Sequence, residues 1–201
     1  MSSIDTLTLE VADPQAAQTF YAAAFGEHSP VRVRRAEDPT SGFRGFSISL
    51  VVSQPSTVRA LVDAAVAAGA TTLKPTAKSF WGVGGVVQAP DGTIWKIATS
   101  AKKDTDPTDR SVEEVVLLLG AADVAASKRF YVEQGLEVAK SFGRKYVEFA
   151  SPASKVKLAL YGRKAAAKDA GVPVDGTGSH RLVIGSGVGS FTDPDGFVWE
   201  N

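Results

Sequence analysis

The 201-residue sequence contains no cysteine, which excludes thiolate nucleophiles, zinc–cysteine sites, iron–sulfur clusters and disulfide bonds. Histidine is scarce, with two residues, so few imidazole ligands are available to a metal ion. The chain has no excess of either charge, because 22 basic residues balance 22 acidic ones. A net charge of zero argues against nucleic acid or an anionic membrane as a partner. No apolar run reaches the roughly 18 residues of a membrane span, and the first residues lack a secretory signal pattern. We therefore expect a soluble cytoplasmic protein.

Two motifs occur once in each half of the chain. Residues 9–21 recur as residues 119–131, with an aspartate and a Phe-Tyr pair in the same places. Residues 89–96 recur as residues 193–200, with Pro-Asp-Gly and a tryptophan in register. A repeat of this length predicts a duplicated structural unit.

The two halves are separated by a stretch dense in charge and without apolar periodicity, which is typical of a solvated linker. We place this linker at residues 101–112, between a first domain at residues 1–100 and a second at residues 113–201.

Each half predicts a strand, then a helix, then further strands. In the first half, Asp13 and Pro14 are suited to cap and begin a helix over residues 14–25 that follows a strand over residues 4–11. A second helix is expected over residues 55–68. Residues 83–88 and 93–98 form a predicted hairpin.

The second half predicts a strand over residues 115–119 and a helix over residues 123–133. Residues 162–179 are mostly Lys, Ala, Gly and Pro, and they show no counterpart of the helix at residues 55–68. We expect a long exposed loop there, so the second domain is predicted to be shortened and to lack the second helix.

The order, spacing and duplication of these motifs resemble the glyoxalase/bleomycin resistance/dioxygenase superfamily, also called the vicinal oxygen chelate superfamily. The resemblance spans nearly the whole chain. It implies an α+β fold in which βαβββ modules pair, so that curved mixed sheets enclose a pocket, and here the arrangement is duplicated in one chain.

In metal-dependent members of the superfamily, the resemblance implies an ion held by four His, Gln or Glu side chains at fixed strand positions. A divalent ion needs at least three such ligands. The positions matched by offset in this sequence carry mostly other residue types: Thr6, Val116, Lys96, Glu200, Phe46 or Ser47, His180, and Lys157 or Ala159.

His180 and Glu200 are thus the two residues left as metal candidates, because His28 follows a helix in a loop. Two ligands make a poor site. We favour no cofactor, with a divalent metal as the less favoured alternative, and the sequence argues against metal-dependent glyoxalase or dioxygenase activity.

Aromatic and cationic residues near the predicted strands are the candidates for binding a small molecule. Phe80 and Trp81 precede small residues that leave room for a ligand, and arginine between aromatic residues is suited to stack on a planar anion. Aromatic residues on apolar faces are more often core residues, so a structural role is the competing interpretation. The predicted ligand-binding residues are Phe43, Arg44, Phe46, Phe80, Trp81, Lys96, Tyr146 and Tyr161.

Three functional hypotheses follow. The leading one is a metal-free protein that binds a small molecule, for example a planar aromatic one, in a sheet-lined pocket. The second is a metal-dependent lyase, isomerase or dioxygenase that uses His180 and Glu200, and the third is a non-catalytic scaffold that keeps only the fold. We expect a small-molecule partner, no nucleic acid and no membrane, in a monomer with pseudo-dimeric halves or a homodimer.

Overall fold

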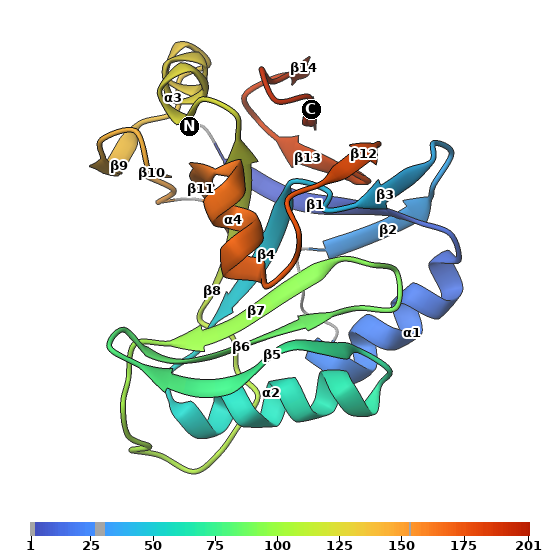
Figure 1. The fold of residues 1–201 in the computed structure, drawn as a ribbon, viewed down its shortest axis with the longest axis vertical. Coiled ribbons are helices and arrows are strands. Elements are labelled where there is room, and N and C mark those ends of the chain that lie inside the picture. Colours follow the sequence, from blue (N-terminus) through green and yellow to red (C-terminus); the bar gives the residue numbers. More distant parts are fainter. Residues whose placement is uncertain (1–2, 27–30, 153) are drawn as a thin grey trace.

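The computed structural model describes residues 3–26, 31–152 and 154–201. Its helices are α1 (Pro14–Phe25), α2 (Pro55–Ala67), α3 (Val124–Glu133) and α4 (Arg163–Ala170). None of the helices in these described ranges is both long enough and apolar enough to cross a membrane. Helices and strands are interspersed along the chain, and the strands form two large curved sheets (Figure 1).

The larger sheet has eight strands and takes four from each half of the chain. From one edge to the other its strands are β5 (Thr71–Ser79), β6 (Gly82–Gln88), β7 (Ile94–Thr99), β4 (Phe46–Val51), β8 (Glu114–Ala121), β11 (Val156–Gly162), β10 (Tyr146–Phe149) and β9 (Val138–Phe142). The two sets of four meet at β4 and β8, which run antiparallel with Ile48 opposite Leu117. The strands on either side, β7 and β11, pair in parallel with β4 and β8. A pseudo-twofold axis therefore passes between β4 and β8.

The smaller sheet joins the start of the chain to its end. Its order is β14 (Phe191–Thr192), β15 (Val198–Glu200), β13 (Leu182–Ser186), β1 (Ile4–Val11) and β2 (Val31–Arg35). β1 pairs antiparallel with β13, so that Leu7 lies opposite Ile184. A separate two-stranded ladder joins β3 (Thr40–Gly42) to β12 (Gly176–Gly178). Every sheet of the described chain thus contains strands from both halves.

The repeated motifs form the same structure twice. The Asp13 carboxylate accepts from the backbone amides of Gln15 and Ala16 at 3.0 and 3.1 Å, and Asp123 caps α3 in the same way. The helices predicted at residues 14–25 and 123–133, and the hairpin of β6 and β7, are confirmed.

The two repeated motifs also contact each other, which explains why they recur together. The Tyr21 hydroxyl donates to the Asp91 carboxylate at 2.6 Å, and the Tyr131 hydroxyl donates to Asp193 at 2.5 Å. Burial and the neighbouring carboxylate raise the pKa of both tyrosines, so each remains a hydrogen-bond donor. The Phe-Tyr pair of each helix is therefore tied to the hairpin turn of its own half.

The expectation of a long loop over residues 162–179 is wrong. Residues Arg163–Ala170 form α4, which ends at Gly171 in the left-handed conformation (φ 79°), and β12 follows. α4 precedes β13, whereas α2 directly follows β4. The helix forms because its buried face, Ala166, Ala167 and Ala170, packs on residues distant in sequence, among them Phe43.

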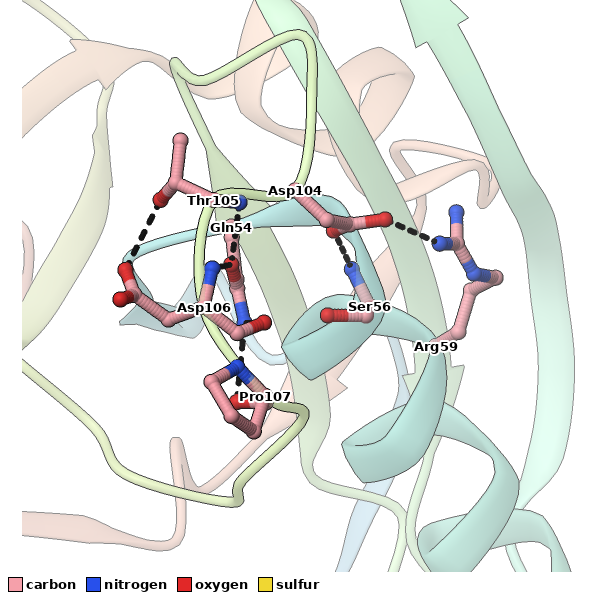
Figure 2. Close-up of polar contacts among 7 residues, drawn as sticks. All are labelled: Gln54, Ser56, Arg59, Asp104, Thr105, Asp106 and Pro107. Carbon is pink, nitrogen blue, oxygen red and sulfur yellow. Dashed lines mark hydrogen bonds and ion pairs between the residues drawn. The ribbon is translucent and has the colours of Figure 1, made fainter.

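The segment that joins the halves has no regular structure but is fastened to α2 (Figure 2). The side chain of Gln54, which is buried, accepts from the amides of Thr105 and Asp106 and donates to the carbonyls of Asp106 and Pro107. The Asp104 carboxylate accepts from the Ser56 amide at 2.6 Å, which caps the first turn of α2. The exposed charges expected here are present, although the path of the segment is fixed.

Candidate functional site on the inner face of the eight-stranded sheet

The two faces of the eight-stranded sheet differ in character. Along β4, the side chains of Phe46, Ile48 and Leu50 enter the main core, together with residues of α1 and α2. Because side chains alternate along a strand, Ser47 and Ser49 face the opposite way. We call this second side the inner face, and α4 lies on it, across β8 and β4 (Figure 1).

Four side chains of the inner face lie in one row across the centre of the sheet. Lys96 on β7 pairs with Ser49 on β4, Ser49 pairs with Val116 on β8, and Val116 pairs with Lys157 on β11. The pseudo-twofold axis passes through the middle of this row and relates Lys96 to Lys157. We refer to the four residues as the central row.

The central row contains three of the positions that the family resemblance assigned to metal ligands, namely Lys96, Val116 and Lys157. The fourth is occupied by Ser49, two residues away from the predicted Ser47. Two lysines, one hydroxyl and one alkyl side chain do not suit a divalent cation, which requires anionic or neutral donors. These residues therefore do not fit the metal ion that the resemblance implies.

Both lysines of the central row bind a carboxylate of the same chain. Lys96 Nζ lies 2.8 Å from Asp169 Oδ2 on α4, and Lys157 Nζ lies 2.5 Å from Glu114 Oε1 on β8. The Lys96 and Lys157 side chains are 33% and 36% exposed, and Ser49 and Val116 are half-buried, so the row remains in contact with solvent. The charges of the row are thus neutralised within the protein, by pairs that water reaches.

α4 is held on the inner face independently of its ion pair. At Gly120 a Cβ atom would lie 3.4 Å from that of Ala166 and 3.2 Å from the Cα atom of Arg163, so the helix packs directly on the β8 backbone. Arg163 donates to the Phe43 carbonyl at 3.0 Å. At the other end, Lys74 donates to the carbonyls of Lys168 and Asp169, both at 2.7 Å, which places a cation at the helix C-terminus.

The predicted residues Phe43, Arg44 and Phe46 occupy three different environments. Phe43 is buried against α4, with the Arg163 guanidinium 5.4 Å from its ring centroid. Arg44 donates to the Asp91 carbonyl at 2.6 Å, and burial lowers its pKa. Phe46 lies in the main core with its ring edge-on to Phe197, on the opposite side of the sheet from Lys96.

Tyr146 and Tyr161 lie on the inner face near the β9 edge. They are register partners, and their rings meet edge-on with centroids 6.0 Å apart. Phe142 on β9 lies 6.0 Å from Tyr146. The Tyr146 hydroxyl donates to Glu148 at 3.1 Å, while burial, followed by that carboxylate, raises the tyrosine pKa. These three rings form an aromatic surface on the inner face, and Tyr161 lies four residues along β11 from Lys157 of the central row.

Phe80 and Trp81 lie at the turn between β5 and β6 and are 79% and 82% exposed. Their rings meet edge-on, 5.1 Å apart, and Lys102 Nζ lies 5.4 Å from the Phe80 centroid. The structure therefore does not bring this pair together with the central row. Its assignment to ligand binding stays a prediction.

His180 and Glu200 are also not brought together. His180 stacks on Phe197, and its two ring nitrogens lie 2.5 and 3.0 Å from the carbonyl oxygens of Arg44 and Asp195. Glu200 lies 3.6 Å from Arg34 on the exposed face of the smaller sheet, in register with Gly185 and not with His180. His28 lies outside the described residues.

Within the described residues, no cluster of three or more His, Asp or Glu side chains is arranged to hold a metal ion. The residues proposed from the sequence as metal candidates have protein partners instead, two carbonyls for His180 and a guanidinium for Glu200.

A groove of about 580 Å³ lies elsewhere, along the exposed side of α1. Alanines supply much of its wall, together with Phe20 and Pro90. Asp13 and Asp91 are its charged residues, and both already accept hydrogen bonds within the protein. The groove offers few groups that could orient a ligand, so we place the candidate site at the central row.

Comparison with known proteins supports the fold. No protein-family model and no curated protein matches the sequence. Among solved structures, glyoxalase I from Zea mays superposes with a TM-score of 0.62 at 14% identity, over 99% of this chain and 91% of that one. A putative dioxygenase from Bacillus subtilis superposes with a TM-score of 0.57 at 13% identity, over 91% of this chain and 69% of that one. The chain therefore has the fold of these two structures over nearly its whole length.

Proposed function

We propose that the protein binds a small molecule on the inner face of the eight-stranded sheet, without a metal ion. The observation that supports this most directly is the composition of the central row. Lys96 and Lys157 are suited to hold a polar or anionic ligand group, and Ser49 adds a hydroxyl between them. The proposal includes no chemical step.

The aromatic surface of Phe142, Tyr146 and Tyr161 supports the same proposal. Tyr161 and Lys157 face the same way on β11, four residues apart, which corresponds to about 13 Å along the strand. The rings therefore suit the planar or apolar body of an extended ligand whose polar end lies at the central row.

A second candidate function is that of a scaffold, and α4 favours it. The helix covers part of the face on which the proposed ligand lies, and its alanines pack against Val86 and Ile94. If the helix fills the face completely in solution, the fold alone is retained. The solvent exposure of the two lysines is the observation that makes binding the leading candidate.

A screen by protein-detected NMR tests the proposal. Neutral and charged planar aromatic compounds are added to the ¹⁵N-labelled full chain, with the amides of Ser49 and Val116 as reporters. Saturable shifts centred on the central row are expected for at least one class of compound. Tyr161→Ala should weaken that binding, and Val132→Ala, which shortens an exposed side chain on α3, is the control. A library that produces no shift on the inner face would refute the proposal and favour the scaffold.

A further inference from the structure

We infer that the ligand of the central row is a dicarboxylate, held by Lys96 and Lys157 in exchange for the carboxylates of Asp169 and Glu114. This inference rests on the proposed function and names its ligand class. It follows from the disagreement between the fold, whose metal-dependent members bind a cation here, and this chain, which places two cations at the same positions.

The chemistry of the row is visible in its present partners. Each lysine binds one carboxylate of the protein, at 2.8 Å for Lys96 and 2.5 Å for Lys157. The lysine ammonium group is a compact charge with three hydrogen-bond donors, and it can bind a ligand carboxylate in the same geometry. All four side chains are about one third exposed or more, so water screens the pairs and competes with them. A ligand carboxylate can therefore replace either protein carboxylate, because the displaced carboxylate is solvated by water and is not left buried without a partner.

The two related lysines of the row suit a ligand with two anionic groups. The Lys96 and Lys157 backbones are separated by three strand spacings, about 14 Å for strands 4.8 Å apart. Both lysines extend from the same face of a curved sheet, so their flexible side chains can converge over Ser49 and Val116. Between two carboxylates, a short aliphatic chain would lie on Val116 and leave the Ser49 hydroxyl free to donate.

Asp169 can release Lys96 without detaching α4 from the sheet. α4 is anchored by Ala166 on Gly120, by Arg163 on the Phe43 carbonyl, and by Lys74 on two helix carbonyls. None of these contacts uses the Asp169 side chain. Removing its charge should therefore leave α4 in place and free Lys96 for a ligand.

Isothermal titration calorimetry at low ionic strength tests the inference, with glutarate as the probe and dimethyl glutarate as its uncharged counterpart. Asp169→Asn should bind glutarate about tenfold more tightly than the wild type. Lys96→Gln and Lys157→Gln should each bind at least tenfold more weakly, and dimethyl glutarate should not bind. Asp63→Asn on α2 and Lys164→Gln on α4 change the same charges at exposed positions and are the matched controls. Amide spectra confirm that each variant is folded.

Three results would overturn the inference. Equal glutarate affinity in Asp169→Asn and in the Asp63→Asn control would show that Asp169 does not compete with the ligand. An effect of Lys96→Gln without one of Lys157→Gln would exclude a dicarboxylate. If carboxylates fail while a neutral compound still shifts the Ser49 and Val116 amides, the ligand class is wrong and the proposed function survives. If no compound of any class shifts them, the proposed function itself fails.

Discussion

Replacing Gln54 with alanine should destabilise the protein, because one buried side chain holds the segment that joins the two halves (Figure 2). Its amide makes four hydrogen bonds, with distances between 2.9 and 3.2 Å. A hydrogen bond contributes about 0.5–1.5 kcal/mol net, and the freed groups on this exposed segment can bond to water. We therefore expect a loss toward the low end of the sum, about 2–3 kcal/mol in the free energy of unfolding.

Urea unfolding measures this loss. With a denaturant slope of about 2–3 kcal/mol/M, the midpoint should fall by about 1 M. Gln88→Ala is the matched control, since the Gln88 side chain donates one hydrogen bond, to the Gly92 carbonyl, and should lose about a quarter as much. The Thr105 and Asp106 amides, which donate to Gln54, should lose their protection from hydrogen exchange. A midpoint shift no larger than that of Gln88→Ala, or unchanged exchange at these two amides, would refute the reasoning.

Three further predictions concern a helix cap, a close contact and an exposed turn. The amides of Ala126 and Ala125 lower the pKa of Asp123. The stabilising contribution of this carboxylate is therefore present above the ordinary pKa of about 3.9 and is lost as the pH falls. Asp123→Asn should flatten the pH dependence of the unfolding free energy between about pH 7 and 3, and an unchanged slope would contradict this. Gly120→Val should lower the free energy of unfolding by about 1–3 kcal/mol, because the new side chain would meet the Gly45 carbonyl and α4. Thermal unfolding measures this loss, and an unchanged melting temperature would mean that α4 is not packed on Gly120. Phe80→Ala and Trp81→Ala should each leave the unfolding free energy within about 0.5 kcal/mol, and a larger loss in denaturant unfolding would show that these rings pack in solution.

Local signals predicted the local structure well. The cap at Asp13, the proline after it and the apolar spacing that ends at Phe25 were sufficient for α1, because a helix terminus is determined by neighbouring residues. α4 has a comparable signal in its alanines and in Gly171, but it is short and rich in lysine. The contact that stabilises it, Ala166 on Gly120, joins segments that are far apart in sequence.

The predicted ligand-binding residues stay a prediction, but the structure shows where they lie. Lys96, Tyr146 and Tyr161 do face the inner side of the sheet, and the position of Lys96 could be counted from the Pro-Asp-Gly turn. The partner of Lys96 is on α4, where the sequence predicted a loop. Counting also assigned Ser47 and His180 to ligand positions, whereas the register places Ser49 opposite Lys96 and Gly185 opposite Glu200. An offset counted along the sequence does not determine the register between strands.

The pairing of β1 with β13 has a consequence for synthesis of the chain. β1 precedes its antiparallel partner β13 by most of the described helices and strands, so β1 leaves the ribosome well before β13 does. Until β13 emerges, one edge of β1 keeps unpaired backbone groups, and the early chain presents a strand edge to other proteins. The contact between β1 and β13 also joins residues that are far apart in the sequence, and contacts of this kind slow folding. The nascent chain should therefore keep this strand edge open, and available for a chaperone to bind, until β13 is made.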